Sequence, residues 1–447
     1  MKWWLMAVML GIYYIMPWIR WDRGPSLPDQ AVLLDLANRR FFMLWIEIWP
    51  HEFYFVAGLL VMAGLGLFLF TSALGRVWCG YACPQTVWTD LFILVERWVE
   101  GDRNNRLRLY RQKWDLKKLR LRMTKWVLWL LIAIATGGAW VFYFTDAPTL
   151  LRGLVTGSAN PVAYMTIGIL AATTFFFGGF AREQICIYAC PWPRIQAAMM
   201  DEDTLTIGYR DWRGEPRGKH RKADGAEKLG DCIDCMACVN VCPMGIDIRD
   251  GQQLACITCG LCIDACDEMM DKIGKPRGLI GYMALTDEPL ERAGAHPKNV
   301  WKHVFRVRTL LYTVLWGGIG TGLVVALFMR APISMTVAPV RNPIYVTLSD
   351  GAIRNTYDIR LHNQQHDARP FKLSLTSAAD LKISLEGADG DTVTVPADET
   401  KLQRVYVTAA PNSPAAISER TPLHFWVEDT TNTDRAEQGT IFFGKGK

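Results

Sequence analysis

The sequence has no cysteine over most of its length. None of the 12 cysteines precedes Cys79 and none follows Cys266, so the last 181 residues contain no thiol. Closely spaced cysteine triplets are typical of metal sites and are a poor framework for disulfides. The chain also lacks the glycine patterns of a Rossmann fold and of a Walker loop, so no motif indicates nucleotide binding.

A strong charge of either sign is missing as well. The 49 Lys and Arg residues exceed the 44 Asp and Glu residues by only five, an excess too mild to indicate nucleic-acid binding. Half of the residues are apolar, although 21% are charged. The apolar residues are concentrated in five long stretches, which excludes a single soluble enzyme.

These five stretches have about the 17–25 residues that a helix needs to cross a bilayer. They are residues 3–19, 53–74, 125–144, 161–180 and 309–329. The first resembles a signal peptide, but its aromatic residues and the lack of a small-residue cleavage site favour a retained anchor. A buried core helix is the alternative for each. We predict a multi-pass membrane protein with a five-helix α transmembrane bundle in contact with lipid.

Loop charge predicts the orientation of these spans. Residues 75–123 contain eleven Lys and Arg, whereas residues 145–160 contain only Arg152. Basic loops stay in the cytoplasm, which places the N-terminus and the segments 75–123 and 181–308 inside. Every cysteine is then cytoplasmic, and the cysteine-free tail lies on the oxidising side. The predicted domains are a transmembrane region (1–180), a cytoplasmic domain (181–308), a fifth helix (309–329) and an outer tail (330–447).

The tail predicts an all-β domain. Short alternating runs recur every 8–14 residues with turn-forming residues between them, as in an immunoglobulin-like (Ig-like) sandwich. The runs are 345–348, 357–361, 371–375, 381–385, 392–395, 403–407, 423–427 and 439–443. No catalytic constellation is visible among them.

The most specific motif is a pair of cysteine runs with the spacing of two-cluster bacterial ferredoxins. In such proteins the fourth cysteine of each run is a ligand of the cluster that the other run holds. The first cysteine set is then Cys232, Cys235, Cys238 and Cys266, and the second cysteine set is Cys256, Cys259, Cys262 and Cys242. Structural zinc is the alternative, but it takes separated pairs rather than triplets. We predict two [4Fe–4S] clusters in a ferredoxin-like α+β domain.

A second motif, C-x-Y-A-C-P, occurs twice. Cys79 and Cys83 end the second span, and Cys186 and Cys190 end the fourth. Both helices run from outside to inside, so the two pairs share the cytoplasmic membrane edge. The proline after each pair favours local unwinding. We call these four cysteines the thiol site. Their soft sulfur donors would suit Cu(I), zinc or an iron–sulfur centre, while packing of small apolar side chains is the structural alternative.

These motifs resemble the CcoG/FixG (RdxA-like) cytochrome c oxidase accessory proteins, which are membrane polyferredoxins. The matching segments are MPWIRWDR at 16–23, QAVLLDL at 30–36, RVWCGYACPQTVW at 76–88, both ferredoxin runs, and PRGLI at 276–280. The resemblance covers nearly the whole chain, including the C-terminal Ig-like domain. It implies a bacterial inner membrane protein with a periplasmic tail.

The resemblance also implies a function in assembly of the cbb3-type oxidase, with reduction of Cu(II) to Cu(I). The expected partners are oxidase assembly factors or copper carriers, and the electron donor is unknown. We hypothesise that Cys79, Cys83, Cys186 and Cys190 bind copper and are the catalytic residues. The alternatives are an electron-transfer subunit linking the quinone pool to a reductase, and a non-redox copper carrier or assembly scaffold.

Overall fold

The computed structural model of the chain describes residues 2–24, 27–218, 229–330, 333–365, 367–387, 390–432 and 434–446. It consists of two compact units. The first comprises residues 1–20 and 30–323 and contains all of the cysteines, and the second comprises residues 21–29 and 324–447. Part of the basic segment that we assign to the cytoplasm, residues 219–228, lies outside the described residues.

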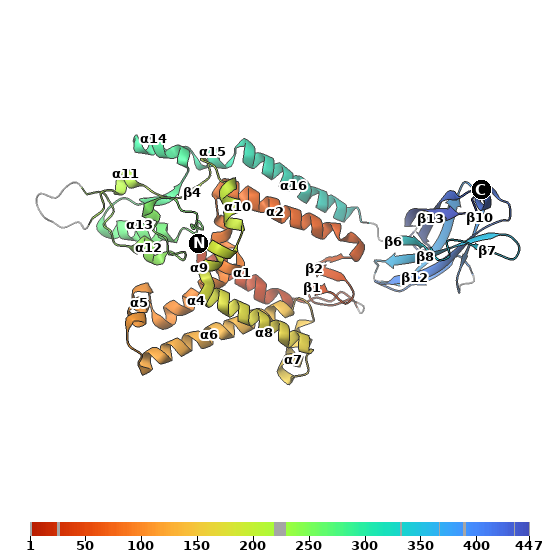
Figure 1. The fold of residues 1–447 in the computed structure, drawn as a ribbon, viewed down its shortest axis with the longest axis horizontal. Helices are drawn as coiled ribbons and strands as arrows, with labels where there is room; N and C mark the ends of the chain where they lie inside the picture. The colour runs from red at the N-terminus through yellow and green to blue at the C-terminus, as the bar shows by residue number, and fades with distance from the viewer. Residues whose placement is uncertain are drawn as a thin grey trace, which may run out of the picture. The chain divides into compact units, whose positions relative to one another are not determined.

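Four helices are long and apolar enough to cross a membrane. They are α2 (Tyr54–Leu74), α6 (Leu116–Val141), the helix Pro161–Ala189 and α16 (Val307–Phe328). The third begins as α8 and continues through shorter turns: α8 (Pro161–Phe176), η3 (Phe177–Ala181), α9 (Arg182–Gln184) and η4 (Ile185–Ala189). Within the first unit, α2 and the start of α16 run side by side (Figure 1). These helices correspond to four of the five predicted spans.

The first predicted span is a shorter helix. The helix α1 (Lys2–Ile15) is followed by a 3₁₀ turn, η1 (Met16–Trp18). Its Lys2 ammonium group is buried and lies 2.8 Å from the carboxylate of Asp90. Farther along α1, the hydroxyl of Tyr14 hydrogen-bonds the hydroxyl of Thr136 in α6. The helix thus packs against the other membrane segments, and a fifth span stays a prediction.

The segment between α1 and α2 contains a small sheet that the sequence does not predict. Its three antiparallel strands are β1 (Val32–Asp35), β2 (Arg40–Met43) and β3 (Ile46–Ile48), followed by the 3₁₀ turn η2 (Pro50–Glu52). The buried Gln30 amide donates to the carbonyl of Phe142, at the end of α6. After α6, the short helix α7 (Ala147–Thr156) leads into α8.

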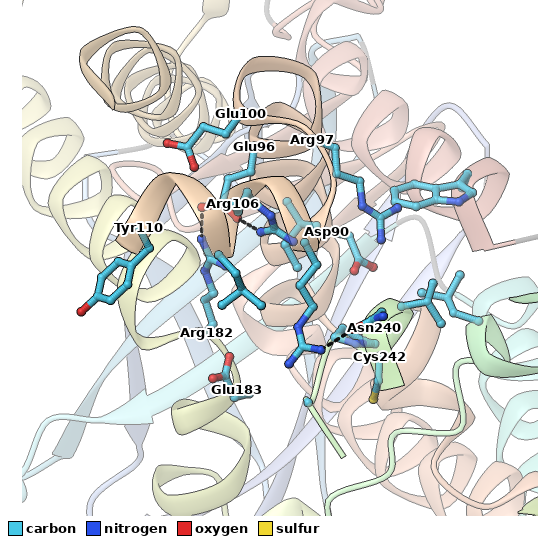
Figure 2. A pocket seen from close by; sticks show the side chains of 18 of the residues that line it. Asp90, Glu96, Arg97, Glu100, Arg106, Tyr110, Arg182, Glu183, Asn240 and Cys242 are labelled. Atoms are coloured by element: carbon cyan, nitrogen blue, oxygen red, sulfur yellow. Dashed lines mark hydrogen bonds and ion pairs between the residues drawn. The ribbon is translucent and has the colours of Figure 1, made fainter. Parts of the chain in front are cut away.

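The basic segment between α2 and α6 is helical. It forms α3 (Val77–Tyr81), α4 (Pro84–Glu100) and α5 (Arg103–Arg111). Pro84 occupies the first position of α4, where its missing N–H is not needed, and Gly101 ends the helix with φ 84°. One face of α4 is buried and carries carboxylates, of which Glu96 pairs with Arg106 and Arg182 (Figure 2). This segment is therefore part of the fold rather than a simple loop.

The segment after the helix Pro161–Ala189 forms the α+β ferredoxin-like domain. Its central strands, β4 (Thr206–Tyr209) and β5 (Ile280–Met283), pair antiparallel around buried Ile207, Ile280 and Met270. Its other elements are α10 (Trp192–Met199), α11 (Asp211–Gly214), α12 (Ala237–Val241), η5 (Ile248–Asp250), α13 (Leu261–Ile273), η6 (Leu285–Asp287), α14 (Glu288–Arg292) and α15 (Val300–Val304).

The second unit contains an all-β sandwich. One sheet has the order β10-β12-β8-β6, with β7 also paired to β8, and the other has the order β11-β9-β13-β14. The strands are β6 (Ile333–Pro339), β7 (Val346–Thr347), β8 (Ile353–Asn363), β9 (Arg369–Ser377), β10 (Leu381–Leu385), β11 (Thr392–Val395), β12 (Thr400–Ala409), β13 (Arg420–Asp429) and β14 (Arg435–Phe443), with the short helix α17 (Pro414–Ile417) before β13.

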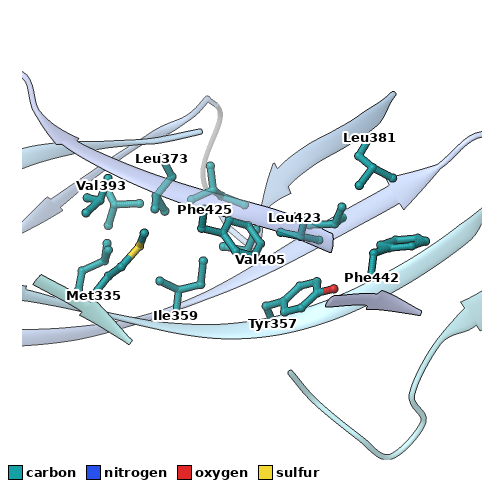
Figure 3. Packing of buried hydrophobic residues seen from close by; sticks show 14 of the residues in the cluster. Met335, Tyr357, Ile359, Leu373, Leu381, Val393, Val405, Leu423, Phe425 and Phe442 are labelled. Atoms are coloured by element: carbon teal, nitrogen blue, oxygen red, sulfur yellow. The ribbon is translucent and has the colours of Figure 1, made fainter. Parts of the chain in front are cut away.

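Alternation of apolar and polar residues builds the core between these sheets. Every second side chain of β8 and β13 points inward, and Tyr357 meets Phe425 with ring centroids 5.2 Å apart (Figure 3). The Tyr357 hydroxyl donates to the carbonyl of Ile441 at 2.8 Å. All eight predicted runs overlap strands, and β6 is an additional strand.

Candidate functional site

The first cysteine set comes together in the structure. Cys266, on α13, lies within electrostatic range of Cys232, Cys235 and Cys238 from the first triplet. Burial, reinforced by these neighbours and by Asp267, raises the pKa of the Cys266 thiol to about 12. The last cysteine of the second run is therefore adjacent to the first triplet, as the crossed ligand pattern predicts.

The second cysteine set surrounds a small cavity. Cys242 of the first run lines this cavity together with Cys256, Cys259 and Cys262 of the second run. The other walls are mainly apolar and include Ile207, Met244, Ile246, Ile248 and Ile257, with Cys238 also at the wall. An apolar shell limits solvent access and so favours the retention and tuning of a redox centre.

The two triplet loops share an unusual backbone conformation. Asp234 and Met236, on either side of Cys235, have φ of 54° and 60°, and Thr258 and Gly260, on either side of Cys259, have φ of 55° and 78°. Left-handed residues placed in this way turn successive N–H groups toward one concavity, an arrangement found at iron–sulfur sites. The loops are thus suited to an anionic cluster.

The arrangement of the cysteines along the chain distinguishes a cluster from structural zinc. Zinc typically takes separated cysteine pairs, whereas both ferredoxin runs contain triplets. The eight cysteines therefore fit two iron–sulfur clusters better than mononuclear zinc.

The four cysteines of the thiol site also lie near one another. Cys186 is within electrostatic range of Cys79, Cys83 and Cys190, although the two pairs come from membrane segments about a hundred residues apart. All four are partly buried. The repeated motif therefore brings two distant parts of the chain to one place, as the sequence predicts.

Both motifs interrupt their helices at the second cysteine. Cys83 has φ −61° and ψ 127°, and Cys190 has nearly the same values, φ −79° and ψ 125°. The residues before Cys190 form a π-helical turn, Ile185–Ala189, whereas those before Cys83 form a short α-helix. The prediction that proline unwinds the backbone at these positions is confirmed.

Gln196 and Arg76, which are both buried, contact the Cys79 thiol. The thiol donates to Oε1 of Gln196, 3.1 Å away, and the same amide donates through Nε2 to Thr71 Oγ1. Gln196 is 1% exposed. Burial raises the pKa of the Cys79 thiol, while the nearby Arg76 guanidinium opposes that increase. The sequence analysis did not identify Gln196, because neither residue type nor spacing marks it.

The thiol site abuts the second cysteine set. A Cβ atom built on Gly80 would lie 2.5 Å from the carbonyl oxygen of Ile257 and 3.1 Å from Cα of Cys259. The Tyr81 hydroxyl donates to the carbonyl of Cys259 at 3.0 Å. The side chains of Cys79 and Cys186 pack against the core that contains Ile257 and Cys259. Residues of the C-x-Y-A-C-P motif thus form the contact with the second triplet loop.

Arg76 strengthens this contact. Its backbone N–H donates to Thr258 Oγ1 at 3.3 Å, and its guanidinium donates to the carbonyl of Leu254. The equivalent arginine of the second motif, Arg182, instead lies 2.8 Å from Glu96 of α4. The two motifs therefore have similar cysteines but different surroundings.

Comparison with known proteins identifies the family. Residues 181–285 match the family described as a 4Fe-4S dicluster domain, residues 55–104 match a 4Fe-4S binding domain, and residues 323–445 match the Ig-like fold at the C-terminus of FixG. Over its whole length the chain is 72% identical to Protein RdxB of Cereibacter sphaeroides, covering 94% of that protein. The chain belongs to the FixG/Rdx family.

Two further members support this assignment. Protein RdxA of Cereibacter sphaeroides is 65% identical over 96% of the chain and 90% of its own length. Nitrogen fixation protein FixG of Rhizobium meliloti is 54% identical over 91% of the chain and 83% of its own length. Together with the four apolar helices, the family places this chain among membrane iron–sulfur proteins that transfer electrons.

Proposed function

We propose that this FixG/Rdx member is a membrane-bound cupric reductase that acts in assembly of a cbb3-type oxidase. In this proposal Cu(II) binds at Cys79, Cys83, Cys186 and Cys190, accepts one electron and leaves as Cu(I). The observation that carries it is the direct packing of the thiol site on the second cysteine set. The resemblance to oxidase accessory proteins supplies copper as the substrate and the oxidase as the destination.

The residues of the site suit this chemistry. Thiolate sulfur is a soft ligand and favours Cu(I) over Cu(II), so binding to the four cysteines helps the reduction. Gln196 holds Cys79 in position, and the charge of Arg76 favours its thiolate. Iron–sulfur clusters held by the two cysteine sets would supply one-electron transfer. The second set is the one next to copper, and the first set is farther along the domain.

The proposed location follows from loop charge. We place the protein in a bacterial inner membrane with five spans, the N-terminus and the ferredoxin-like domain in the cytoplasm, and the Ig-like domain in the periplasm. The eleven basic residues in 75–123 support this orientation. Oxidase assembly factors or copper carriers are the proposed partners of the periplasmic domain.

Anaerobic assay of the full chain in detergent tests the function. With the clusters reduced and their absorption bleached, added Cu(II) should yield Cu(I), detected by a Cu(I)-specific chromophore, as the iron–sulfur absorption recovers. Exchange of all four cysteines of the thiol site for Ser should abolish this activity and leave about eight iron atoms per chain, the content of two cubes. The matched variant Cys256→Ser should lose iron as well as activity. Copper reduction that persists without the four thiols would contradict the proposal.

A second candidate is electron transfer between the quinone pool and a reductase, with a further iron–sulfur centre at the thiol site. One observation favours it: the 4Fe-4S binding domain match over 55–104 contains only Cys79 and Cys83. Iron analysis separates the candidates, because a third cube would give about twelve iron atoms per chain and two would give about eight.

A further inference from the structure

A second cavity lies beside the second cysteine set. Its volume is about 380 Å³, and α4, α5 and the segment Asn240–Gly245 form its walls (Figure 2). Cys242 and Pro243 belong to this wall, and Trp3 and Tyr110 also line it. The size is at the lower end of the range for small-molecule sites. Neither the copper hypothesis nor the thiol site uses this cavity.

The carboxylates in the cavity are neutralised by nearby cations. Glu96 contacts Arg106 and lies 2.8 Å from Arg182 and 3.2 Å from Lys125. Lys125 is also 2.9 Å from Glu100, which lies 3.4 Å from Arg122. These carboxylates are buried and already paired, so they are unavailable as ligands for an added cation.

Two arginines of the cavity are less tightly paired than the others: Arg97 acts on Asp90 only through its charge, and Arg103 forms no ion pair with a carboxylate among the described residues. Arg97 lies over the Trp3 ring, 5.8 Å from its centroid, and Arg103 donates to Asn240 Oδ1 at 2.5 Å. Five cations line the cavity against four carboxylates, a net charge of +1, and Lys2 and Lys125 pair with three of these carboxylates from behind: the lining cations are Arg97, Arg103, Arg106, Arg122 and Arg182, and the carboxylates are Asp90, Glu96, Glu100 and Glu183. Such an excess in a partly enclosed space attracts an anion.

We propose that this cavity binds an organic phosphate, with Arg97 and Arg103 as the phosphate-binding residues. Guanidinium groups bind phosphate through paired, charge-assisted hydrogen bonds, and Trp3 and Tyr110 offer aromatic surface to an attached ring. The phosphate comes from one of two sources: a mononucleotide such as flavin mononucleotide, or a phospholipid headgroup. The cavity has to hold only the phosphate and the group next to it, and both ligands are small enough there.

A phosphate here would also act on the neighbouring redox centre. Because Cys242 is in the cavity wall, the bound anion adds negative charge next to the second cysteine set. Reduction of a cluster adds one more negative charge, so a nearby anion makes reduction harder. This consequence rests on the proposed cluster at that set, whereas phosphate binding itself does not.

Binding to the full-length protein in phosphate-free detergent tests the proposal. The probes are flavin mononucleotide, inorganic phosphate and short-chain phosphatidylglycerol, with riboflavin as the probe that lacks phosphate. Arg97→Gln and Arg103→Gln should each weaken phosphate binding about tenfold, because a charge-assisted hydrogen bond contributes at least that factor. The matched control is Arg277→Gln, which removes an exposed arginine paired with Asp271. Unchanged iron content and melting temperature confirm that each variant folds.

The outcomes identify the source or overturn the site. Saturable binding of flavin mononucleotide but not riboflavin, lost in the two arginine variants, assigns a mononucleotide. The same pattern for phosphatidylglycerol alone assigns a lipid headgroup. In both cases the ligand should move the reduction midpoint of one cluster to a more negative potential, and less so in the variants. No saturable binding by any phosphate probe, or equal binding by the variants and wild type, overturns the proposal. Exchanging the four thiol-site cysteines for Ser tests the copper hypothesis and should leave this binding unchanged.

Discussion

The two C-x-Y-A-C-P motifs share the backbone conformation of their second cysteine but differ in their surroundings. In both, the second cysteine is extended and is followed by proline. The first motif has Gly80 between its cysteines, and its backbone approaches the loop of the second cysteine set closely, whereas the second motif has Ile187 at the equivalent position and packs this side chain on the same core. The comparison indicates that both motifs contact the ferredoxin-like domain and that the close backbone contact is made by the first.

The arginines that precede the two motifs also contact different parts of the protein. Arg76 is 3% exposed and bonds backbone and side-chain groups of the segment 254–258. Arg182 forms an ion pair with Glu96 on α4, and both residues line the proposed phosphate-binding cavity. The first arginine therefore attaches the thiol site to the ferredoxin-like domain, and the second attaches it to the neighbouring membrane-edge helix.

The largest difference should come from the residue between the cysteines. Gly80→Ala places a methyl group 2.5 Å from the Ile257 carbonyl oxygen, so the two backbones must separate. We expect destabilisation of about 1–3 kcal/mol, as for other overpacked contacts, and loss of most copper reduction. Ile187→Ala, the matched change in the second motif, removes side-chain volume without a clash and should retain most of the activity. Thermal unfolding and the anaerobic copper assay measure both variants. Equal loss in the two would contradict the division between the motifs.

The grouping of the cysteines could be predicted from the sequence better than these contacts. Cysteine spacing identifies the ferredoxin runs because three thiols of a short loop must reach three corners of one cube. The close approach of Gly80 to Ile257 joins residues far apart in the chain, and no local pattern marks it. The alternation in the tail predicts eight strands, but the helix α4 is hidden because buried Glu96 and Glu100 depend on remote cations. Both features depend on contacts between residues far apart in the chain, so patterns of neighbouring residues could not predict them.

A pH-dependent effect should distinguish the two arginines. Burial opposes ionisation of Glu96, but a hydrogen bond from Arg182 and the charges of Arg182, Lys125 and Arg106 hold the pKa of this carboxyl below its ordinary value. Its contribution to stability is therefore complete above the pKa of the unfolded chain and is lost as the pH falls through the lower folded pKa. Arg182→Gln should reduce this contribution, so the melting temperature at neutral pH falls and its further loss on acidification becomes smaller.

The matched variant Arg76→Gln serves as the comparison. Arg76 does not contact Glu96, so its loss should leave the acid limb of the melting-temperature profile in place. It should instead weaken copper binding, because the remaining Cys79 thiol loses the nearby charge that favours its thiolate. Melting temperature measured between pH 4 and 7, together with copper affinity at pH 7, covers both effects. A change of the acid limb in Arg76→Gln as large as in Arg182→Gln would show that the two networks are not separate.

The smallest expected effect concerns the two glutamines that hold the motifs. Gln196 accepts from the Cys79 thiol, whereas Gln85 donates to the carbonyls of Phe177 and Arg182 near the second motif. The proton that Cys79 shares with Gln196 leaves when the thiolate binds a metal, so Gln196→Leu removes only a contact that positions Cys79 and should weaken Cu(I) affinity by no more than about fivefold, the equivalent of about 1 kcal/mol. Gln85→Leu should cost similar stability and leave Cu(I) affinity nearly unchanged, because Gln85 touches no cysteine in the structure. Competition with a Cu(I) chelator measures the affinities, and a larger loss in Gln85→Leu would show that the second motif, rather than the first, fixes the position of the metal.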